Sequence, residues 1–459
     1  MCVTPRDPHI SLLQYLREQA ALRGTKEGCA EGDCGACTIV LGQLDGAKVK
    51  YRAINACIYL LAQVHGCEVI TVEGLQDQDG ALHPVQQALV EFHGSQCGFC
   101  TPGFVMSLYA HYRNQLPNDR RSLKDTLAGN LCRCTGYGPI LSAGQAMYGY
   151  QRPDEPDNLA ILQAIEAARQ QGERLFIPTT EQELQELLQN YPDAVLWAGG
   201  TDTGLWLSKH LQELSTIILL GQIPSLDFVR ENKDGLAIGA TTAYADVIEL
   251  FTNKWPAMGE VMRRIGSTQI RNSGTIGGNI ANGSPIGDMA PMLMVLGGKL
   301  RLTSANGIRE ILLEDYFIAY GKQDLQAGEY VHSIFIPKAT EDMIFHAWKI
   351  SKRFDQDISA VLGAFAYERN GQEIKKLRIA YGGMAAIPKR AVLSEKVLQG
   401  TAGTPEQLKQ AKLALIQDFT PLSDMRASAQ YRQQVAGALL TKAFSFNPVS
   451  LAIAEPPDE

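Results

Sequence analysis

Cysteine is absent from everything that follows Cys134 in this chain of 459 residues. All 10 cysteines therefore lie in the first part of the sequence. The N-terminus also lacks the basic segment and apolar core of a secretory signal, which argues against an extracellular disulfide framework. Metal ligation in a reducing cytoplasm explains the cysteines better.

Long hydrophobic runs and excess positive charge are missing as well. No apolar segment approaches the ~18 residues of a membrane span, and the nearest, Met289–Gly298, is interrupted by Pro291. A net charge of −7 with a pI near 5.7 argues against nucleic acid as the main partner. We expect a cytoplasmic protein without membrane segments, divided into roughly three domains of ~150 residues.

Four of the cysteines follow the C-x4-C-x2-C…C spacing of a plant-type ferredoxin, which holds a [2Fe–2S] cluster. They are Cys29, Cys34, Cys37 and Cys57. Gly28, Gly32 and Gly35 would relieve crowding where the loop bends around the sulfurs. A zinc site and buried thiols are the alternatives, but a zinc ribbon usually has two matched Cys-x2-Cys pairs. The spacing therefore favours an iron–sulfur cluster.

The surrounding segments predict a small α+β unit. Residues Ile10–Arg23 have helical periodicity, with Gly24 as the expected C-terminal cap. Short alternating strands follow at Thr38–Leu41 and Lys48–Arg52, joined by a turn at Asp45-Gly46.

A second set of four cysteines lies between predicted helices. The set consists of Cys97, Cys100, Cys132 and Cys134. Thr101 is the expected cap of a helix with Pro102 at its first position, and Ser122 the cap of another. With Val85–Phe92 and Ile140–Tyr148 these make a set of four helices. By itself this spacing is compatible with zinc or with [2Fe–2S], but beside a ferredoxin-type loop we interpret it as a second redox centre.

Glycine-rich stretches distinguish the rest of the chain. One occupies residues 199–204 after a predicted strand at Val195–Ala198, and another occupies residues 273–288. Neither has the spacing of a dinucleotide-binding fold or a P-loop. Their backbone N–H groups could cradle a pyrophosphate, although on glycine content alone tight turns are the better explanation. Strands at Phe345–Ile350, Ala360–Tyr367 and Leu377–Tyr381 are then followed by helices to about residue 444.

Three longer motifs resemble the iron–sulfur half of the molybdenum hydroxylases, the family of xanthine dehydrogenase and aldehyde oxidase. They are Lys26–Cys37, Gln96–Gly103 and Asn130–Tyr137. The resemblance implies an α+β multidomain chain: a plant-type ferredoxin-like β-grasp domain (1–66), a four-helix [2Fe–2S] domain (67–150), a linker (151–174), a vanillyl-alcohol-oxidase-type FAD domain (175–340) and a CO-dehydrogenase-flavoprotein-like C-terminal α+β domain (341–459). Relatives begin with a β-hairpin before the first helix, so either the ferredoxin sheet lacks its first strands or the true start lies upstream.

The resemblance also assigns FAD contacts. They are Leu196, Gly199, Gly200, Thr201, Asp202, Thr203, Thr275, Gly278, Asn279, Asn282, Asp288, Val331 and Lys349. Arg263 matches a charge cluster near the flavin, but Arg264-Ile265 stand where relatives often carry aromatic residues. Gln96 and Cys134 match positions close to a molybdopterin.

Taken together, the resemblance implies the electron-transfer subunit of a xanthine dehydrogenase-type enzyme, which hydroxylates hypoxanthine and xanthine to urate. The chain ends at Glu459 without a molybdenum-site motif, so we expect molybdopterin on a large partner subunit, in a heterotetramer or larger complex. Electrons would pass from the second cluster to the first, then to FAD and NAD+, with no catalytic residue in this chain beyond bound FAD. Another molybdenum hydroxylase, acting on an N-heterocycle or aldehyde with a different acceptor, and a zinc-binding non-redox scaffold are the alternatives.

Overall fold

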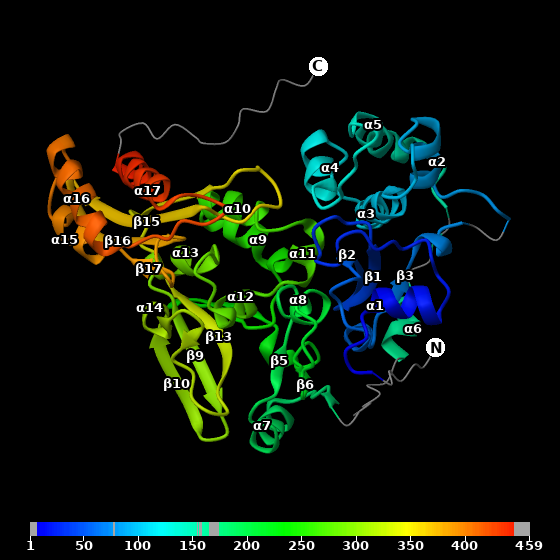
Figure 1. Ribbon diagram of the computed structural model, residues 1–459, viewed down its shortest axis with the longest axis horizontal. Coiled ribbons are helices and arrows are strands. Elements are labelled where there is room, and N and C mark those ends of the chain that lie inside the picture. The colour runs from blue at the N-terminus through cyan, green and yellow to red at the C-terminus, as the bar shows by residue number, and fades with distance from the viewer. Residues whose placement is uncertain (1–6, 77–78, 154, 156–157, 165–173, 445–459) are drawn as a thin grey trace. The chain divides into compact units, whose positions relative to one another are not determined.

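The computed structural model describes residues 7–76, 79–153, 155, 158–164 and 174–444. These residues form two compact units (Figure 1). The first unit comprises Met1–Ser225, Ala243–Asp246 and Ile265–Thr275, and the second comprises Leu226–Thr242, Val247–Arg264 and Ile276–Glu459.

The first unit begins with a small antiparallel sheet in the order β2-β1-β3. Its strands are β1 (Thr38–Asp45), β2 (Lys48–Asn55) and β3 (Glu68–Ile70). The hairpin between β1 and β2 turns at Gly46, whose φ of 61° favours glycine. The predicted strands and turn are therefore confirmed. Both strands are longer than expected: β1 continues to Asp45 at the turn, where it becomes exposed, and β2 continues as a buried strand to Asn55.

The first helix is shorter than the sequence predicts. It comprises α1 (Leu12–Gln14) and a π-helical continuation (Tyr15–Gln19), not Ile10–Arg23. The chain leaves the helix at Ala21, which takes the left-handed conformation (φ 58°), while the N–H of Leu22 donates to the carbonyl of Leu16. Gly24 is therefore not the cap. The turn at Ala21 places Leu22 against the core that contains Leu12, Leu13 and Leu16, so packing and not the nearest glycine accounts for the helix end.

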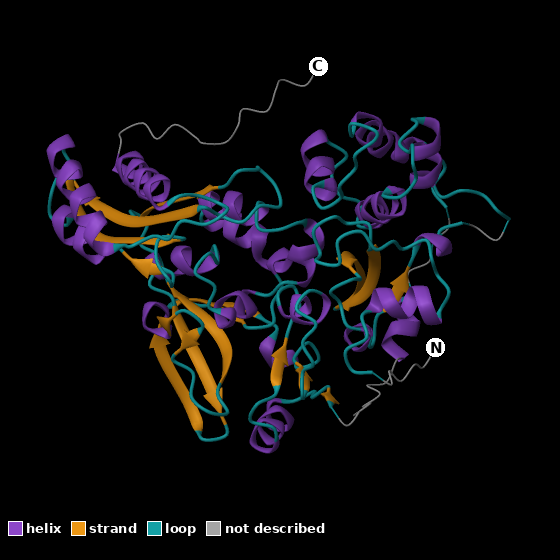
Figure 2. Ribbon diagram, in the orientation of Figure 1, coloured by secondary structure: helices purple, strands orange, loops and turns teal. Residues whose placement is uncertain are grey.

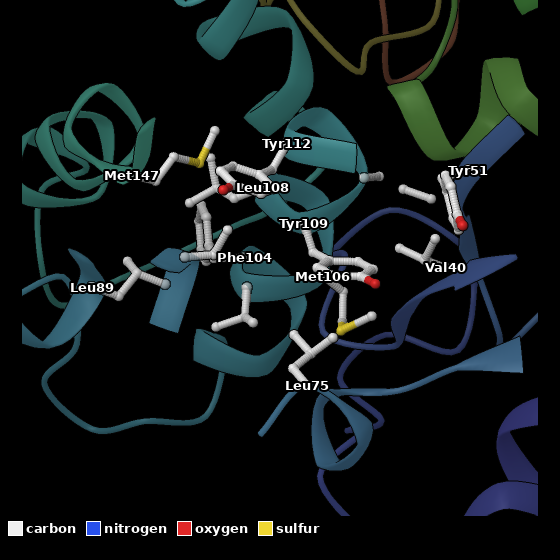
Figure 3. Close-up of a cluster of buried hydrophobic side chains, with 14 of the residues drawn as sticks. Val40, Tyr51, Leu75, Leu89, Phe104, Met106, Leu108, Tyr109, Tyr112 and Met147 are labelled. Atoms are coloured by element: carbon white, nitrogen blue, oxygen red, sulfur yellow. The ribbon is translucent and has the colours of Figure 1, made fainter. Parts of the chain in front are cut away.

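Helices α2 to α5 pack against one another and against the hairpin. Figure 3 shows Phe104, Leu108 and Tyr112 of α3 within this core, together with Val40 and Tyr51 of the sheet. The helices are α2 (Pro84–Glu91), α3 (Thr101–Arg113), α4 (Arg120–Leu127) and α5 (Gly138–Ala146). All four predicted helices are present.

Two predicted helix caps are wrong by one to three positions. Cys100 is the N-cap of α3, so Thr101 already lies in the first turn with Pro102. Asp119 caps α4, and its carboxylate accepts a hydrogen bond from the backbone N–H of Ser122. An aspartate at the N-cap serves the same free N–H groups as a serine, so sequence alone chose the wrong one of two good caps.

The rest of the first unit contains a small parallel sheet in the order β4-β6-β5. Thr180 caps α7 by accepting a hydrogen bond from the N–H of Glu183. The elements are α6 (Leu159–Ala164), β4 (Leu175–Phe176), α7 (Glu181–Asn190), β5 (Val195–Trp197), α8 (Thr203–Ser208), β6 (Ile217–Leu219) and α11 (Thr268–Ser273), with short 3₁₀ turns at Leu61–Val64, Val72–Gly74, Met147–Gly149 and Pro224–Leu226.

The second unit contains two larger antiparallel sheets, ordered β10-β9-β13-β8-β7 and β14-β15-β16-β17. Its strands are β7 (Val229–Glu231), β8 (Gly235–Gly239), β9 (Lys299–Ser304), β10 (Gly307–Leu312), β11 (Phe317–Ala319), β12 (Lys322–Gln323), β13 (Tyr330–Pro337), β14 (Ile344–Ile350), β15 (Val361–Asn370), β16 (Glu373–Gly382) and β17 (Lys389–Arg390). The helices that lie in it wholly or in part are α9 (Tyr244–Lys254), α10 (Pro256–Arg263), α12 (Ile276–Asn282), α13 (Met289–Val295), α14 (Leu313–Tyr316), α15 (Val392–Leu398), α16 (Pro405–Asp418) and α17 (Ala429–Phe444).

Helices α15 to α17 cover one face of the second of these sheets (Figure 2). The hydroxyls of Tyr367 and Tyr381 donate to carbonyls of α17, so the buried tyrosines are satisfied. The late strands and helices expected from the sequence are thus confirmed. Among the described residues, no helix is both long and apolar enough to cross a membrane.

Candidate functional site

The hairpin brings the first cysteine set together. Thr38 at the start of β1 pairs with Asn55 at the end of β2, so Cys37 and Cys57 lie side by side just beyond the paired strands. The N–H of Ala56 donates to the carbonyl of Cys37 across this gap. Cys37 and Cys57, twenty positions apart in sequence, therefore become neighbours because of strand register.

The loop from Cys29 to Cys34 folds around the sulfur of Cys29. The backbone N–H groups of Glu31 and Cys34 donate to Sγ of Cys29 at 3.4 and 3.3 Å. Gly32 and Gly35 have φ of +76° and +71°, and a Cβ on Gly28 would lie 2.8 Å from Sγ of Cys34. The structure thus agrees with the expectation that glycine relieves crowding here, and the N–H···S bonds are of the kind that tunes an iron–sulfur cluster.

The thiols of this set interact directly with one another. The pKa of Cys29 lies far below its usual value because its sulfur accepts hydrogen bonds from the thiols of Cys34 and Cys57. The pKa values of Cys34 and Cys57 are raised, since both thiols donate to Cys29. Four mutually adjacent sulfurs on a glycine-rich loop are a suitable donor set for a [2Fe–2S] cluster.

The second cysteine set lies where α3 and α5 begin. The thiol of Cys134 interacts with Cys97, and that of Cys100 with Cys132. Hydrogen bonds from the N–H of Phe99 and then from Cys134 lower the pKa of Cys97, whereas burial and Cys132 raise the pKa of Cys100 to about 12. The structure therefore brings these four residues together as well.

Local hydrogen bonds orient the second pair of this set. Burial by itself would raise the pKa of Cys132, but the hydroxyl and N–H of Thr135 donate to its sulfur and lower it. The N–H of Cys132 donates to the hydroxyl of Tyr137 at 2.9 Å. Cys97 and Cys134 are exposed, as is Gln96, so one side of this set faces the surface of the chain.

Within the described ranges, no three cysteine, histidine or carboxylate side chains are arranged to hold one metal ion. A binuclear cluster has a different requirement, because its four thiolates are shared between two irons. Both cysteine sets match this requirement in donor type.

The first glycine loop follows β5 and contacts Ser273, the last residue of α11, and Gly274 after it. A Cβ on Gly199 would lie 1.9 Å from the carbonyl oxygen of Ser273, and one on Gly274 would lie 3.2 Å from Oγ1 of Thr201. Gly200 has φ +73° over the buried Trp197. The two glycine stretches therefore meet backbone to backbone, with no room for side chains between them.

The other residues predicted around this loop lie close by in sequence. Leu196 lies in β5, Asp202 is exposed, Thr203 begins α8, and Thr275 is buried and forms an isolated bridge with Ala243.

The first glycine loop also adjoins the first cysteine set. A Cβ on Gly204 would lie 2.6 Å from the carbonyl of Ile58, the residue after Cys57. The indole N–H of Trp197 donates to Oε1 of Gln63 at 2.9 Å. A cavity of about 310 Å³ is lined by Cys57, Trp197 and Gly204, among others, so the first cysteine set and the glycine loop border one space.

In the second unit, the predicted flavin residues include a buried ion pair. The ammonium of Lys349 donates to Asp288 at 2.6 Å and to the hydroxyl of Ser359 at 3.0 Å, and that hydroxyl donates to Asp288 at 2.5 Å. The side chains of Lys349 and Asp288 are 2% and 6% exposed, so the pair is removed from water. Sequence analysis missed Ser359, for which no motif provides a signal.

The other predicted residues of this unit lie on α12 and β13. Gly278 and Asn279 are in α12, and Oδ1 of Asn279 is buried with no hydrogen-bond partner among the described residues. Asn282 ends the helix and is exposed, and Val331 is buried in β13. An unsatisfied buried amide oxygen is a feature that a bound polar ligand would satisfy.

The arginines after α10 have separate roles. Arg263 forms an ion pair with Glu260 at 3.0 Å. Arg264 donates to the carbonyl of Lys349 at 3.0 Å and to that of Phe354, and its guanidinium lies 4.6 Å from the ring centre of Phe354. Arg264, to which the resemblance assigns no role, thus fixes the segment that follows Lys349.

Three family models match the chain in succession. A [2Fe-2S] binding domain matches residues 71–145, the FAD binding domain in molybdopterin dehydrogenase matches residues 164–339, and the CO dehydrogenase flavoprotein C-terminal domain matches residues 346–445.

Similar proteins include two long redox enzymes. Xanthine dehydrogenase 1 of Arabidopsis thaliana is 32% identical over 498 residues, covering 91% of this chain and 36% of that protein. Aldehyde oxidase 2 of Mus musculus is 30% identical over 502 residues, covering 95% of this chain and 37% of that protein. The chain thus spans little more than a third of the length of these relatives.

Among solved structures, the cyanide-inactivated form of the Cu,Mo-CO dehydrogenase is similar, with a TM-score of 0.56 and 28% identity. The match covers 59% of this chain and 95% of that one. Three domain matches in this order, together with relatives that align along most of the chain, place it in the molybdenum hydroxylase family, as a chain like the family's small iron–sulfur and FAD-binding subunits.

Proposed function

We propose that this chain is the electron-transfer part of a molybdenum hydroxylase and holds two [2Fe–2S] clusters and FAD. The observation that carries the proposal is the grouping of eight thiols into two sets of four, each set in mutual contact. The ligands of the first cluster are Cys29, Cys34, Cys37 and Cys57, and those of the second are Cys97, Cys100, Cys132 and Cys134.

The FAD assignment is supported by two features of the chain. The first loop carries no side chain at Gly199 or Gly200, and a glycine backbone of this kind suits a pyrophosphate. The unsatisfied amide oxygen of Asn279 requires a polar partner. The individual FAD contacts and the five-segment domain division stay predictions.

The positions of the two cysteine sets support an order of transfer. Cys97 and Cys134 are exposed, which suits exchange with a molybdenum centre on a partner subunit. Cys57 borders the cavity that also touches Gly204 of the glycine loop, which suits exchange with the flavin. Bound FAD would supply the conversion between one-electron transfer at the clusters and two-electron exchange with NAD+.

More specifically, we propose that the complex is a xanthine dehydrogenase. Hypoxanthine and xanthine are hydroxylated to urate on a molybdopterin-binding large subunit, and NAD+ is the electron acceptor. The complex is a cytoplasmic heterotetramer or a larger assembly. The similarity to Xanthine dehydrogenase 1 supports it. A molybdenum hydroxylase for aldehydes is the second candidate, because Aldehyde oxidase 2 is nearly as similar, at 30% against 32% identity.

The test uses the purified chain alone and then with its molybdenum subunit. Alone, it should contain about four irons, oxidise NADH with an artificial dye, and turn over neither xanthine nor an aldehyde. With the partner present, xanthine should reduce NAD+, and Cys134→Ala should abolish this reaction while sparing NADH-to-dye activity. Zinc in place of iron would refute the redox function, and turnover of aldehydes but not xanthine would select the second candidate.

A further inference from the structure

A buried polar cluster lies between the two cysteine sets. It contains Thr38, which follows Cys37, and Ser107 of α3, together with Asn130, two residues before Cys132. The three side chains are 1%, 0% and 2% exposed. The hydroxyl of Ser107 donates to Oδ1 of Asn130 at 2.6 Å, so residues next to both cysteine sets are already connected.

Gly35, which lies between Cys34 and Cys37, is the other anchor of this cluster. Its carbonyl accepts hydrogen bonds from the hydroxyl of Thr38 at 2.6 Å and from Nδ2 of Asn130 at 3.2 Å. The N–H of Leu131 donates to the carbonyl of Cys34 at 3.0 Å. A single backbone hydrogen bond therefore connects Cys34 of the first set to Leu131, the residue before Cys132.

A glutamine from a distant part of the chain lies at the centre of the cluster. Nε2 of Gln269, on α11, is 3.1 Å from the hydroxyls of both Thr38 and Ser107, and 3.3 Å from Oδ1 of Asn130. Gln269 is 1% exposed, and it lies 139 to 231 residues away from these partners in sequence. It is also the only one of the four that lies in the segment matched by the FAD-binding domain model.

This glutamine is costly to bury. Its Oε1 is buried with no hydrogen-bond partner among the described residues, and it faces Gly129, where a Cβ would lie 2.0 Å away. An apolar side chain of similar size would fill the space without leaving an unsatisfied oxygen. An apolar side chain could not, however, replace the amide N–H groups of Gln269, which contact all three polar neighbours.

The backbone segments around the buried polar cluster are packed directly against one another. A Cβ on Gly35 would lie 2.1 Å from the carbonyl of Gly129, and one on Gly103 would lie 2.2 Å from the carbonyl of Gly35. Small displacements of the buried polar side chains would therefore move the loops that carry both cysteine sets.

We propose that Gln269 is a positioning residue that sets the distance and contact between the two [2Fe–2S] clusters, and thereby their electron exchange. The inference rests on the proposed function. The step concerned is the passage of one electron, in which the second cluster is oxidised and the first is reduced, with no bond made or broken. Through Gln269, the flavin-binding part of the chain contributes to a transfer that takes place outside it.

The test replaces Gln269 by methionine, which has similar length and no donor. Iron and FAD contents should be unchanged, but the magnetic splitting between the two clusters in low-temperature EPR spectra of the reduced protein should be lost. Transfer between the clusters after rapid one-electron reduction should slow severalfold. Asn272→Leu is the matched control. Asn272 lies on the same helix as Gln269, and its amide donates to the carbonyl of Ala53, which is not part of the buried polar cluster. Its spectra should match those of the unaltered protein.

If Gln269→Met fails to fold, Thr38→Val and Ser107→Ala each remove one partner of the glutamine and should each weaken the splitting. Wild-type splitting and transfer rate in a fully loaded Gln269→Met protein, or in both partner variants, would overturn the inference. Absence of iron–sulfur signals from the unaltered protein would instead overturn the proposed function.

Discussion

Replacing Gly199 by alanine should weaken FAD binding while leaving both cysteine sets intact. The added Cβ would lie 1.9 Å from the carbonyl oxygen of Ser273 and 2.7 Å from its carbonyl carbon. These are backbone atoms, so no side chain can rotate to make room. The two glycine stretches would have to separate by about 1.5 Å to reach an ordinary contact distance of about 3.5 Å.

The size of the effect follows from this overlap. Forcing extra volume into a close-packed site costs about 1–3 kcal/mol. If the strain falls on the conformation that binds FAD, the affinity should drop by about 5- to 150-fold, at 1.4 kcal/mol for each factor of ten.

The measurement is titration of flavin-free protein with FAD, together with the flavin and iron contents of the purified protein. Gly221→Ala is the matched control, because a Cβ there has no neighbour within 4 Å. It should bind FAD normally. Unchanged FAD affinity in Gly199→Ala would show that these loops do not form the pyrophosphate site. Loss of iron together with FAD would show that the change acts on the whole unit and not on the loop.

Three further outcomes are expected. Cys57→Ala should remove one low-temperature EPR signal of the reduced protein and spare the other; loss of both signals would contradict independent ligand sets. Lys349→Met should destabilise the protein by about 3–5 kcal/mol, because it leaves the buried carboxylate of Asp288 without its cation; calorimetry should find most of the loss restored by adding Asp288→Asn. Burial lowers the pKa of His111 to about 4. As the pH drops from ~6.5 towards 4, the imidazole therefore takes up a proton in the unfolded chain but not in the folded one. The free energy of unfolding should fall over this range by about 3 kcal/mol in total. The melting temperature of His111→Asn should be less sensitive to pH in that window, and an equally steep dependence would exclude His111 as its cause.

Cysteine spacing and strand pattern were sufficient to predict the first cysteine set. The reason is that its geometry is local: a glycine loop and one hairpin bring four thiols together, and the turn at Gly46 fixes the register that pairs Thr38 with Asn55. The helices around the second set were equally visible, since capping residues and apolar periodicity act within a few positions. Where two residues could cap the same helix, the sequence prediction was wrong, as it was for Ser122 in place of Asp119. Thr101 was wrong for another reason, because Cys100 takes the N-cap position of α3 without a side-chain capping hydrogen bond.

Contacts between distant segments depend on tertiary structure alone. Gln269 has no signal in its own neighbourhood, because its role comes from three partners far away in sequence. Ser359 likewise acquires a role only when β14 and the segment before β15 bring it to Lys349 and Asp288. The end of the first helix at Ala21, in place of Gly24, was also decided by packing. The sequence by itself indicated which cysteines form the two sets of four and which local elements carry them, since these depend on short-range geometry. The tertiary structure decided which side chains hold those elements at a fixed distance, because that depends on backbones meeting closely across more than a hundred residues of chain.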